Sequence, residues 1–335
     1  MERRPLGRTG LSVSALGFGA GAVGGLMVRG DRADQTAAVA RALDAGVTYF
    51  DTAPSYGDGR SEENLGRVLR ELGAWGRVVV GTKVRLQPDG LANPVAAIER
   101  SCEASLRRLG RESVDLLQLH NPITGSQAAG PPVVGSGHAV TLETVGGPVA
   151  EGMRRLVARG LVRHIGITGL GQTAALHAAV ASGAFATIQT YFNALNPSAG
   201  FPGASGGEQD FEGLIGAAAA AGVGVINIRV LAAGALAARP ARHPNAGDPG
   251  PLLAAGTEYG RNLERAAAIR GLAADLGCEG PVELALRFAL ATPGISTVLV
   301  GYSGQGQLED ALRWTARGPV AGDVMRRVVD LARSS

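Results

Sequence analysis

Four residues of this sequence have the chemistry needed to polarise a carbonyl group and to transfer a proton to it. Asp51 and Tyr56 follow one short apolar run, Lys83 ends the next, and His120 ends the one after that. A free tyrosine has a pKa of about 10, so at neutral pH it needs a neighbour that stabilises its phenolate. The ammonium of Lys83 would do this, and the carboxylate of Asp51 would hold and balance the lysine. His120 would orient a substrate oxygen or help to relay its proton, so the set predicts general acid–base chemistry.

The segments around these residues predict alternating strands and helices. The runs 47–50, 78–83 and 114–120 are rich in β-branched or apolar residues, and the segments 61–70 and 93–109 between them are typical of helices. In a parallel α/β barrel the carboxyl ends of successive strands meet at one mouth. We therefore predict that the four side chains converge there.

The stretch 46–53, Gly-Val-Thr-Tyr-Phe-Asp-Thr-Ala, resembles the signature of the aldo-keto reductase family, and the four candidate residues match its catalytic tetrad in order. The similarity extends from residue 4 to residue 310. It implies an α/β fold, a (β/α)8 TIM barrel with long loops at its C-terminal face, in a single domain spanning 1–335. An N-terminal β-hairpin at 4–13 would plug the barrel.

The same resemblance implies an NAD(P)-dependent oxidoreductase. It would transfer a hydride between a nicotinamide and a carbonyl or alcohol, in an aldehyde, a ketone or a sugar. Tyr56 would be the general acid or base, assisted by Lys83, Asp51 and His120.

The resemblance also assigns residues that hold the nicotinamide. Thr168 keeps the hydroxyl of a family serine that binds the carboxamide, whereas Gly169 replaces the asparagine that follows it. Gln189 matches a second carboxamide ligand. Ile228 stands where many members have an aromatic residue, so it would contact the ring without stacking on it. Arg229 would bind the cofactor pyrophosphate or a substrate acid, or it would form an exposed salt bridge.

The turn 301–308 after the last predicted strand opens a helix, where free N–H groups favour a phosphate. Members that prefer NADPH commonly present Lys or Arg at this turn, and this chain presents neither. Asp310 would oppose a 2′-phosphate. We therefore expect NAD to be used at least as readily as NADP. The predicted cofactor contacts are Gly19, Ala20, Asp51, Thr168, Gly169, Gln189, Ile228, Arg229, Gly301, Ser303, Gln307 and Asp310.

Four segments rich in glycine read as loops. The segment 20–25 predicts either a close-approach loop over the cofactor or a flexible one. The insertion 121–148, which has no periodicity of its own, predicts a substrate-pocket element. The segment 196–209 predicts a second insertion, and 231–259 predicts a loop that folds over the cofactor.

Composition predicts a soluble cytoplasmic protein, and the resemblance implies that its partner is a small-molecule substrate. The net charge is +3, from 32 basic and 29 acidic residues with no dense basic stripe, so neither nucleic acid nor an anionic membrane is an expected partner. The first residues lack the apolar core of a signal peptide, and no stretch approaches 18 uninterrupted apolar residues. Cys102 and Cys278 are far apart, so we expect free thiols rather than a disulfide, and we expect no metal site. A monomer or weak oligomer is expected.

Three alternatives stay open. The first is an NAD-dependent aldose 1-dehydrogenase, because the sugar dehydrogenases of the family have similar opening segments and last turns. The second is Schiff-base chemistry at Lys83, as in aldolases. The third is a non-catalytic nucleotide-sensing interaction protein, since some family members are channel subunits.

Overall fold

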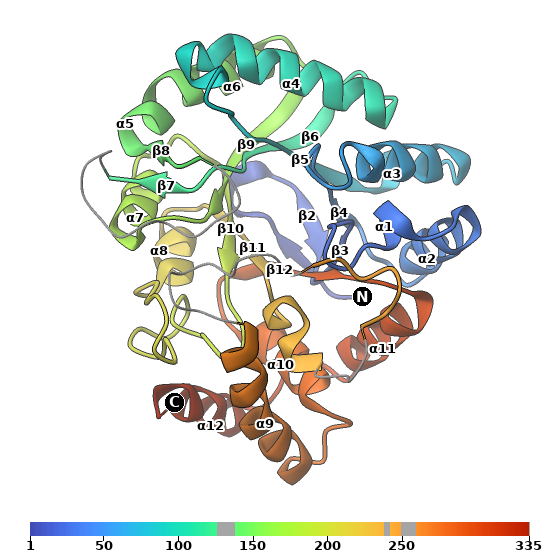
Figure 1. The fold of residues 1–335 in the computed structure, drawn as a ribbon, viewed down its shortest axis with the longest axis vertical. Coiled ribbons are helices and arrows are strands. Elements are labelled where there is room, and N and C mark those ends of the chain that lie inside the picture. Colours follow the sequence, from blue (N-terminus) through green and yellow to red (C-terminus); the bar gives the residue numbers. More distant parts are fainter. Residues whose placement is uncertain (126–137, 238–241, 249–258, 335) are drawn as a thin grey trace.

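Eight parallel strands close into a barrel in this computed structural model, which describes residues 1–125, 138–237, 242–248 and 259–334. Figure 1 shows the helices arranged around these strands. The predicted (β/α)8 barrel is confirmed. In spatial order the strands are β10 (Thr187–Tyr191), β11 (Gly224–Ile228), β12 (Ile295–Gly301), β3 (Leu16–Gly19), β4 (Tyr49–Asp51), β5 (Val79–Val84), β6 (Val114–Leu119) and β9 (Val162–Gly169).

The strands are apolar because helices cover their outer face and other side chains fill the barrel. All residues of β4 and β5 are buried. A parallel strand buried on both faces reads as a continuous apolar run instead of an alternating one. In β4 and β5 the charged residues, Asp51 and Lys83, therefore stand out, and they lie near the carboxyl ends.

Two of the longer helices in the described chain begin at a residue whose side chain caps the first turn. Asp31 caps α2 (Arg32–Asp44) by accepting from Asp34 N at 2.8 Å, and Asn93 caps α4 (Pro94–Leu109) by accepting from Ala96 N at 3.2 Å. The other helices of eight or more residues are α3 (Arg60–Glu71), α6 (Ala150–Ala158), α7 (Thr173–Ala181), α9 (Tyr259–Asp275), α10 (Pro281–Ala291), α11 (Gln305–Ala316) and α12 (Gly322–Arg333).

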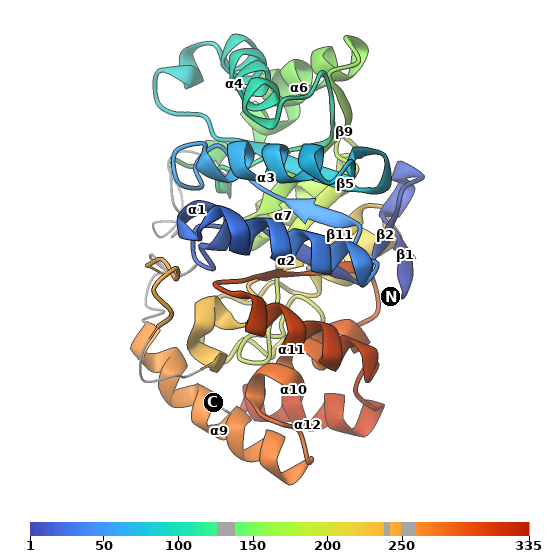
Figure 2. The same ribbon diagram turned by 90° about the vertical axis from the view of Figure 1, so that its right-hand side faces the viewer.

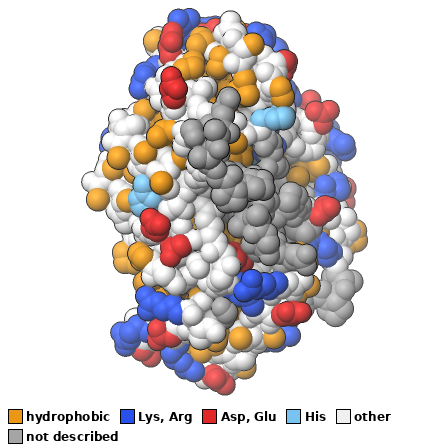
Figure 3. All heavy atoms as spheres, turned by 60° about the vertical axis from the view of Figure 1, so that its left-hand side comes forward, with side chains coloured by type: hydrophobic (Ala, Val, Ile, Leu, Met, Phe, Trp, Pro, Cys, Tyr) orange, Lys and Arg blue, Asp and Glu red, His pale blue; other side chains and the backbone are white. Residues whose placement is uncertain are grey.

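Two shorter helices are α1 (Leu26–Arg29) and α8 (Leu214–Ala220). On the outside of the barrel α2 lies between α3 and α11 (Figure 2). No helix in the described part of the chain is both long and apolar enough to span a membrane. On the face in Figure 3, side chains of both charge signs are interspersed.

An antiparallel hairpin closes the amino-terminal end of the barrel, as predicted. It consists of β1 (Arg3–Pro5) and β2 (Ser12–Ser14). Leu6 and Val13 from this hairpin are fully buried and pack in one cluster with inward-facing side chains of the barrel strands. Gly7 has φ +52°, and a Cβ there would lie 2.2 Å from Gly224 N, so only glycine fits.

The prediction that the insertion 121–148 lacks secondary structure is wrong for its described ends. They form two short paired strands, β7 (Ile123–Thr124) and β8 (Val140–Thr141), followed by α5 (Leu142–Thr144) and a π-helical turn, Val145–Val149, that leads into α6. A hydrogen bond from Ile123 N to Leu170 O, 2.8 Å long, fixes this segment to the barrel rim. Residues 126–137, with the Ala-Gly-Pro-Pro run, lie outside the described residues.

The insertion 196–209 packs against the segment that follows β9, where Gln209 Nε2 donates to Gly171 O at 2.7 Å. Glu208 in this insertion forms a buried ion pair of 3.1 Å with Arg265 on α9. Burial makes such charges costly. In spite of the pairing, burial raises the pKa of Glu208 and lowers the pKa of Arg265. The loop 231–259, called the third loop because it is the third long one after 121–148 and 196–209, contains a short 3₁₀ segment, Ala232–Ala237.

Both cysteines are free, as predicted. Burial raises the pKa of the Cys102 thiol to about 12. That thiol is therefore protonated and unreactive at neutral pH.

Candidate active site

Lys83 and Asp51 form a buried ion pair at the carboxyl end of the barrel. The two side chains are 1% and 2% exposed, and the Lys83 ammonium donates to Asp51 Oδ1 and, at 2.9 Å, to Thr52 O. Strand register explains the meeting, because Asp51 on β4 lies opposite Gly81 on β5, two residues before Lys83. A side chain at Gly81 would fill this space, since its Cβ would lie 2.7 Å from the Tyr49 hydroxyl.

Three neutral groups complete the environment of Asp51. Its Oδ2 accepts from Gln189 Nε2 at 2.6 Å, from Gln118 Nε2 at 3.2 Å and from the Tyr49 hydroxyl at 3.2 Å. Gln118 and Tyr49 are contacts that sequence reasoning missed. Each lies two residues before a predicted site residue on its strand, so period-two alternation would have placed it on the same inward face. This network holds Asp51 as an oriented carboxylate.

Tyr56 lies above the ion pair on the loop that follows β4. The Lys83 ammonium is 4.8 Å from the centroid of the Tyr56 ring. Gly57, Asp58 and Gly59 all have positive φ and turn the chain from Tyr56 into α3. Ser61 donates to Ala20 O at 2.8 Å and anchors that helix start. The loop therefore presents the phenol from a fixed position.

Lys83 remains charged in this environment. Burial alone would lower its pKa, but the neighbouring Asp51 and Tyr56 side chains outweigh that effect, so the pKa of Lys83 is raised. Lys83 does not itself line the cavity described below. Its effect on a substrate would therefore pass through Tyr56.

His120 completes the group of four and is electrically neutral. Its ring meets the Tyr56 ring edge to face, with centroids 5.9 Å apart. Burial, together with the positive charges of Lys83, Arg85 and Arg229, holds the pKa of His120 well below its usual value of 6.5. Nδ1 of His120 lies 3.2 Å from Arg85 Nη2. Arg85 is a further site residue that sequence reasoning missed.

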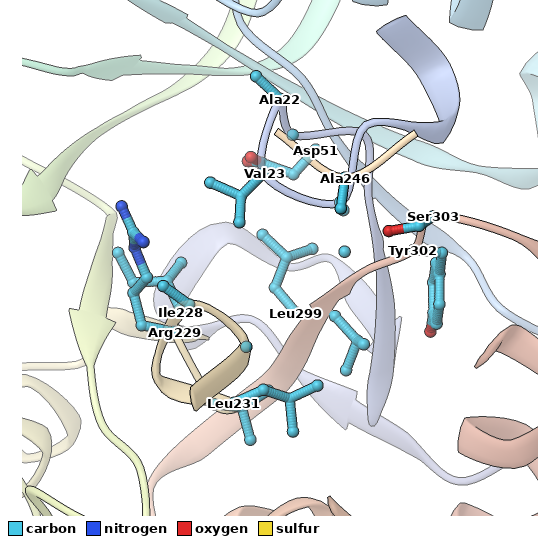
Figure 4. Close-up of a pocket in the computed structure, with 18 of the residues that line it drawn as sticks. Ala22, Val23, Asp51, Ile228, Arg229, Leu231, Ala246, Leu299, Tyr302 and Ser303 are labelled. Carbon is cyan, nitrogen blue, oxygen red and sulfur yellow. The ribbon is translucent and has the colours of Figure 1, made fainter. Parts of the chain in front are cut away.

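A cavity of about 570 Å³ opens beside these residues. Asp51, Tyr56 and His120 line one end, and the turn after β12 lines the other. Figure 4 shows Ile228 and Arg229 on one side of it and Ser303 on the opposite side. The volume is in the range of pockets that hold cofactors and small ligands.

Most of the predicted cofactor residues line this cavity. Those that do are Gly19, Asp51, Thr168, Gln189, Ile228, Arg229, Gly301, Ser303, Gln307 and Asp310. Ala20 and Gly169 do not. Ala20 is buried behind the cavity wall, where its carbonyl accepts from Ser61.

Thr168 supports the presence of a polar ligand at this place. Its hydroxyl is buried and, among the residues that the structure describes, has no hydrogen-bond partner. A buried unpaired hydroxyl is costly unless a ligand satisfies it. Gln189 lies opposite Thr168 in the strand register, although its amide nitrogen is used by Asp51. A carboxamide group therefore fits the donor set at this end of the cavity.

Packing explains why glycine occupies position 169. A Cβ there would lie 2.7 Å from the carbonyl oxygen of Gln189, which belongs to the barrel backbone and cannot move aside. The asparagine expected from the family resemblance has no room.

We expect Gly169→Ala to lower the free energy of unfolding by about 1–3 kcal/mol in a denaturant titration. Gly216→Ala is the matched control. Gly216 is in α8 and its Cβ would meet nothing within 4 Å, so this change should stabilise slightly. Equal effects of the two substitutions would contradict the packing argument.

A side chain of α11 holds the turn after β12. Gln307 Oε1 accepts from Ser303 N at 2.8 Å, which joins the first turn of the helix to the residue before its N-cap. Asp310 forms an ion pair of 2.9 Å with Arg313. A Cβ at Gly24 would lie 2.6 Å from Tyr302 N, so the loop 20–25 does approach this turn closely.

A segment from the third loop crosses the cavity. We call residues 242–248 the strap. Its Gly247 N donates to Val23 O at 2.9 Å, and its Asn245 Nδ2 donates to Ser303 O at 3.0 Å. The strap therefore joins the loop after β3 to the turn after β12. It also brings Arg242 and His243 to the cavity wall, which sequence reasoning missed.

The described ends of the insertion 121–148 contribute nothing to the cavity lining, and neither does 196–209. The third loop, by contrast, supplies nine lining residues in its described parts and at the start of α9, from Leu231 to Tyr259. The loop predicted to fold over the cofactor is thus the one that covers the cavity.

Sequence comparison decides the family. The model of the aldo/keto reductase family matches residues 15–333. The chain belongs to the aldo/keto reductase family. As a member of the aldo/keto reductases it is an NAD(P)-dependent oxidoreductase, and the predicted enzyme class is confirmed.

Two of the similar proteins are named as dehydrogenases of sugars. L-galactose dehydrogenase of Arabidopsis thaliana is 30% identical over 318 residues, which cover 92% of this chain and 86% of that protein. D-threo-aldose 1-dehydrogenase of a Pseudomonas species is 36% identical over 137 residues, which cover 34% of this chain and 41% of that protein. An aldo-keto reductase of Bacillus halodurans, solved in its holo form, shares the fold with a TM-score of 0.74 and 24% identity, covering 100% of this chain and 97% of that one.

Proposed function

We propose that this aldo/keto reductase interconverts a carbonyl and an alcohol on a small sugar-like molecule, with Tyr56 as the proton donor in reduction and the acceptor in oxidation. The observation that carries the proposal is the placement of the Lys83 ammonium, held by Asp51 and 4.8 Å from the Tyr56 ring. A fixed cation beside a phenol stabilises the phenolate that forms when the proton leaves.

Different residues around the cavity would bind the cofactor and the substrate. Thr168 and Gln189 would hold the carboxamide of the nicotinamide, and Ile228 would contact its ring. When bound, the nicotinamide supplies or accepts the hydride. His120, neutral at physiological pH, would donate a hydrogen bond to the substrate oxygen and orient it toward Tyr56.

A sugar substrate is supported by two facts. Two similar proteins are named as dehydrogenases of sugars. The cavity has hydrogen-bonding side chains in Tyr56 and His120, which suit a molecule with hydroxyl groups. An NAD-dependent aldose 1-dehydrogenase is therefore the specific activity that we propose.

The lack of a cation on the turn 301–304 supports use of NAD. Arg242 does reach the cavity wall, but its guanidinium donates to Gly247 O at 2.7 Å within the strap and to the Tyr259 hydroxyl at 3.3 Å. Asp310, which lines the cavity near the turn, is paired with Arg313 and offers no cation to a phosphate. A 2′-phosphate would gain little from this arrangement.

We expect NADH to bind at least as tightly as NADPH in a fluorescence titration of the purified protein, and turnover with NAD on a panel of aldoses. The panel should include simple aldehydes and ketones, which separate sugar oxidation from general carbonyl reduction. Binding of either nucleotide without turnover on any substrate would favour a nucleotide-sensing protein. Borohydride trapping of a substrate on Lys83 would instead indicate Schiff-base chemistry.

A further inference from the structure

Arg85 makes a direct contact with the ring of His120 that determines which nitrogen carries the proton. Arg85 Nη2 lies 3.2 Å from His120 Nδ1. A guanidinium has only donors and stays charged, so Nδ1 must accept in this hydrogen bond. A neutral imidazole that accepts at Nδ1 carries its proton at Nε2. That proton is the donor that a carbonyl or hydroxyl oxygen in the cavity requires.

The backbone holds the two residues side by side. His120 N donates at 2.8 Å to the carbonyl oxygen of Val84, the residue before Arg85. On the other side, the side-chain amide of Asn121 forms two hydrogen bonds with the backbone of Leu86. Leu86 N donates to Asn121 Oδ1 at 2.8 Å, and Asn121 Nδ2 donates to Leu86 O at 2.8 Å. Hydrogen bonds before and after the pair therefore fix their relative position, and the contact between the side chains is part of the barrel rim.

We propose that Arg85 is a positioning residue that holds His120 in the neutral tautomer protonated at Nε2, ready to donate to the substrate oxygen. This inference rests on the proposed role of His120, but the tautomer itself can be observed without any substrate. Arg85 acts through His120, and a structural role alone would not select a tautomer.

The charges around His120 make Arg85 important for its ionisation as well. Lys83 from β5, Arg85 after β5 and Arg229 after β11 all present positive charge to the ring, and each disfavours the imidazolium, as does burial. Tyr56 presents its ring to the imidazole from the loop after β4. The carboxylate on β4 is paired with the lysine. Removing one of the three cations should therefore raise the pKa of His120.

The direct test is the long-range proton–nitrogen NMR spectrum of the full chain with labelled histidine, recorded with and without NADH. The spectrum separates the two neutral tautomers, and comparison with His120→Gln identifies the signals of His120. We expect the Nε2–H pattern in the wild type and in Arg85→Lys, which keeps a charged donor. In Arg85→Met we expect a mixture of tautomers and a higher titration midpoint, because one of the positive charges beside the ring is lost.

Turnover gives a second readout. In Arg85→Met we expect kcat to fall on the order of 10-fold, the effect of losing one hydrogen bond. We also expect a new break on the acid side of the pH profile, at the pH where His120 titrates. Arg85→Lys should restore both. Arg154→Met, on the exposed part of α6 outside the cavity, removes the same charge as a control.

Two results would overturn the inference: an Nδ1–H pattern in the wild type, or an unchanged tautomer and midpoint in Arg85→Met. A protein that shows the expected tautomers but turns over no substrate would contradict the proposed function and leave this inference intact. The amide spectrum of each variant shows whether the chain is folded. If Arg85→Met does not fold, Asn121→Asp is tested in its place. That change removes the donor to Leu86 O and should loosen the same pair.

Discussion

Replacing Tyr56 with phenylalanine is expected to lower kcat by about 10²- to 10⁴-fold while the affinity for NADH stays nearly unchanged. The substitution removes the hydroxyl that would exchange the proton and keeps the ring that packs beside Lys83 and His120. Fluorescence titration would measure the binding, and steady-state turnover on the best substrate of the panel would measure kcat. The expected split between binding and turnover identifies a group that acts in the transition state.

Tyr191→Phe is the matched control for this experiment. Tyr191 is buried at the end of β10, stacks on Phe211 with ring centroids 5.7 Å apart, and is outside the cavity lining. Loss of its hydroxyl should cost about 1 kcal/mol of stability and leave turnover intact. If Tyr56→Phe kept wild-type turnover, the proton would have to come from another group, and His120 would be the first candidate.

Replacing Lys83 with methionine is expected to abolish turnover and to lower the free energy of unfolding by about 3–5 kcal/mol. The change leaves Asp51 as a buried carboxylate with only neutral donors, from Tyr49, Gln118 and Gln189. Denaturant unfolding followed by circular dichroism measures the stability. The loss should be present throughout neutral pH. Because the folded pKa of Lys83 is raised, its contribution is complete below the unfolded value of about 10.4 and declines only as the pH rises through the folded value.

The double variant Asp51→Asn/Lys83→Met separates stability from chemistry. It removes both charges, so it should recover a large part of the lost stability. It should remain inactive, because no cation then lies beside Tyr56. A single Lys83→Met variant that lost less than about 1 kcal/mol would show that the pair does not behave as a buried ion pair. Activity in the double variant would remove Lys83 from the mechanism.

Local patterns in the chain were sufficient for the barrel and for the meeting of the four candidate residues. Each βα unit carries its own strand run and turn, and a polar residue at the carboxyl end of a strand is recognisable without knowledge of the other strands. Asp51, Lys83 and His120 stand at such ends, and a closed parallel barrel brings such ends to one mouth whatever the details of packing. The hairpin plug and the caps at Asp31 and Asn93 are equally local.

Contacts between side chains from different units were not predictable in this way. These contacts depend on strand register and on how distant loops pack. They include the hydrogen bond between Arg85 and His120, the hydrogen bonds that Gln118 and Gln189 donate to Asp51, and the bond that holds the strap across the cavity.

The same limit applies to the loops and to Gly169. The insertion 121–148 looked like a pocket element because it is long and rich in glycine and proline, but its described ends are paired on the barrel rim. Gly169 looked like a lost cofactor contact, whereas the backbone of Gln189 leaves no space for a side chain. By itself the sequence determined which residues stand at the barrel mouth, because strand ends are local features. The tertiary structure alone decided which of them touch, since those distances depend on the packing of the whole barrel.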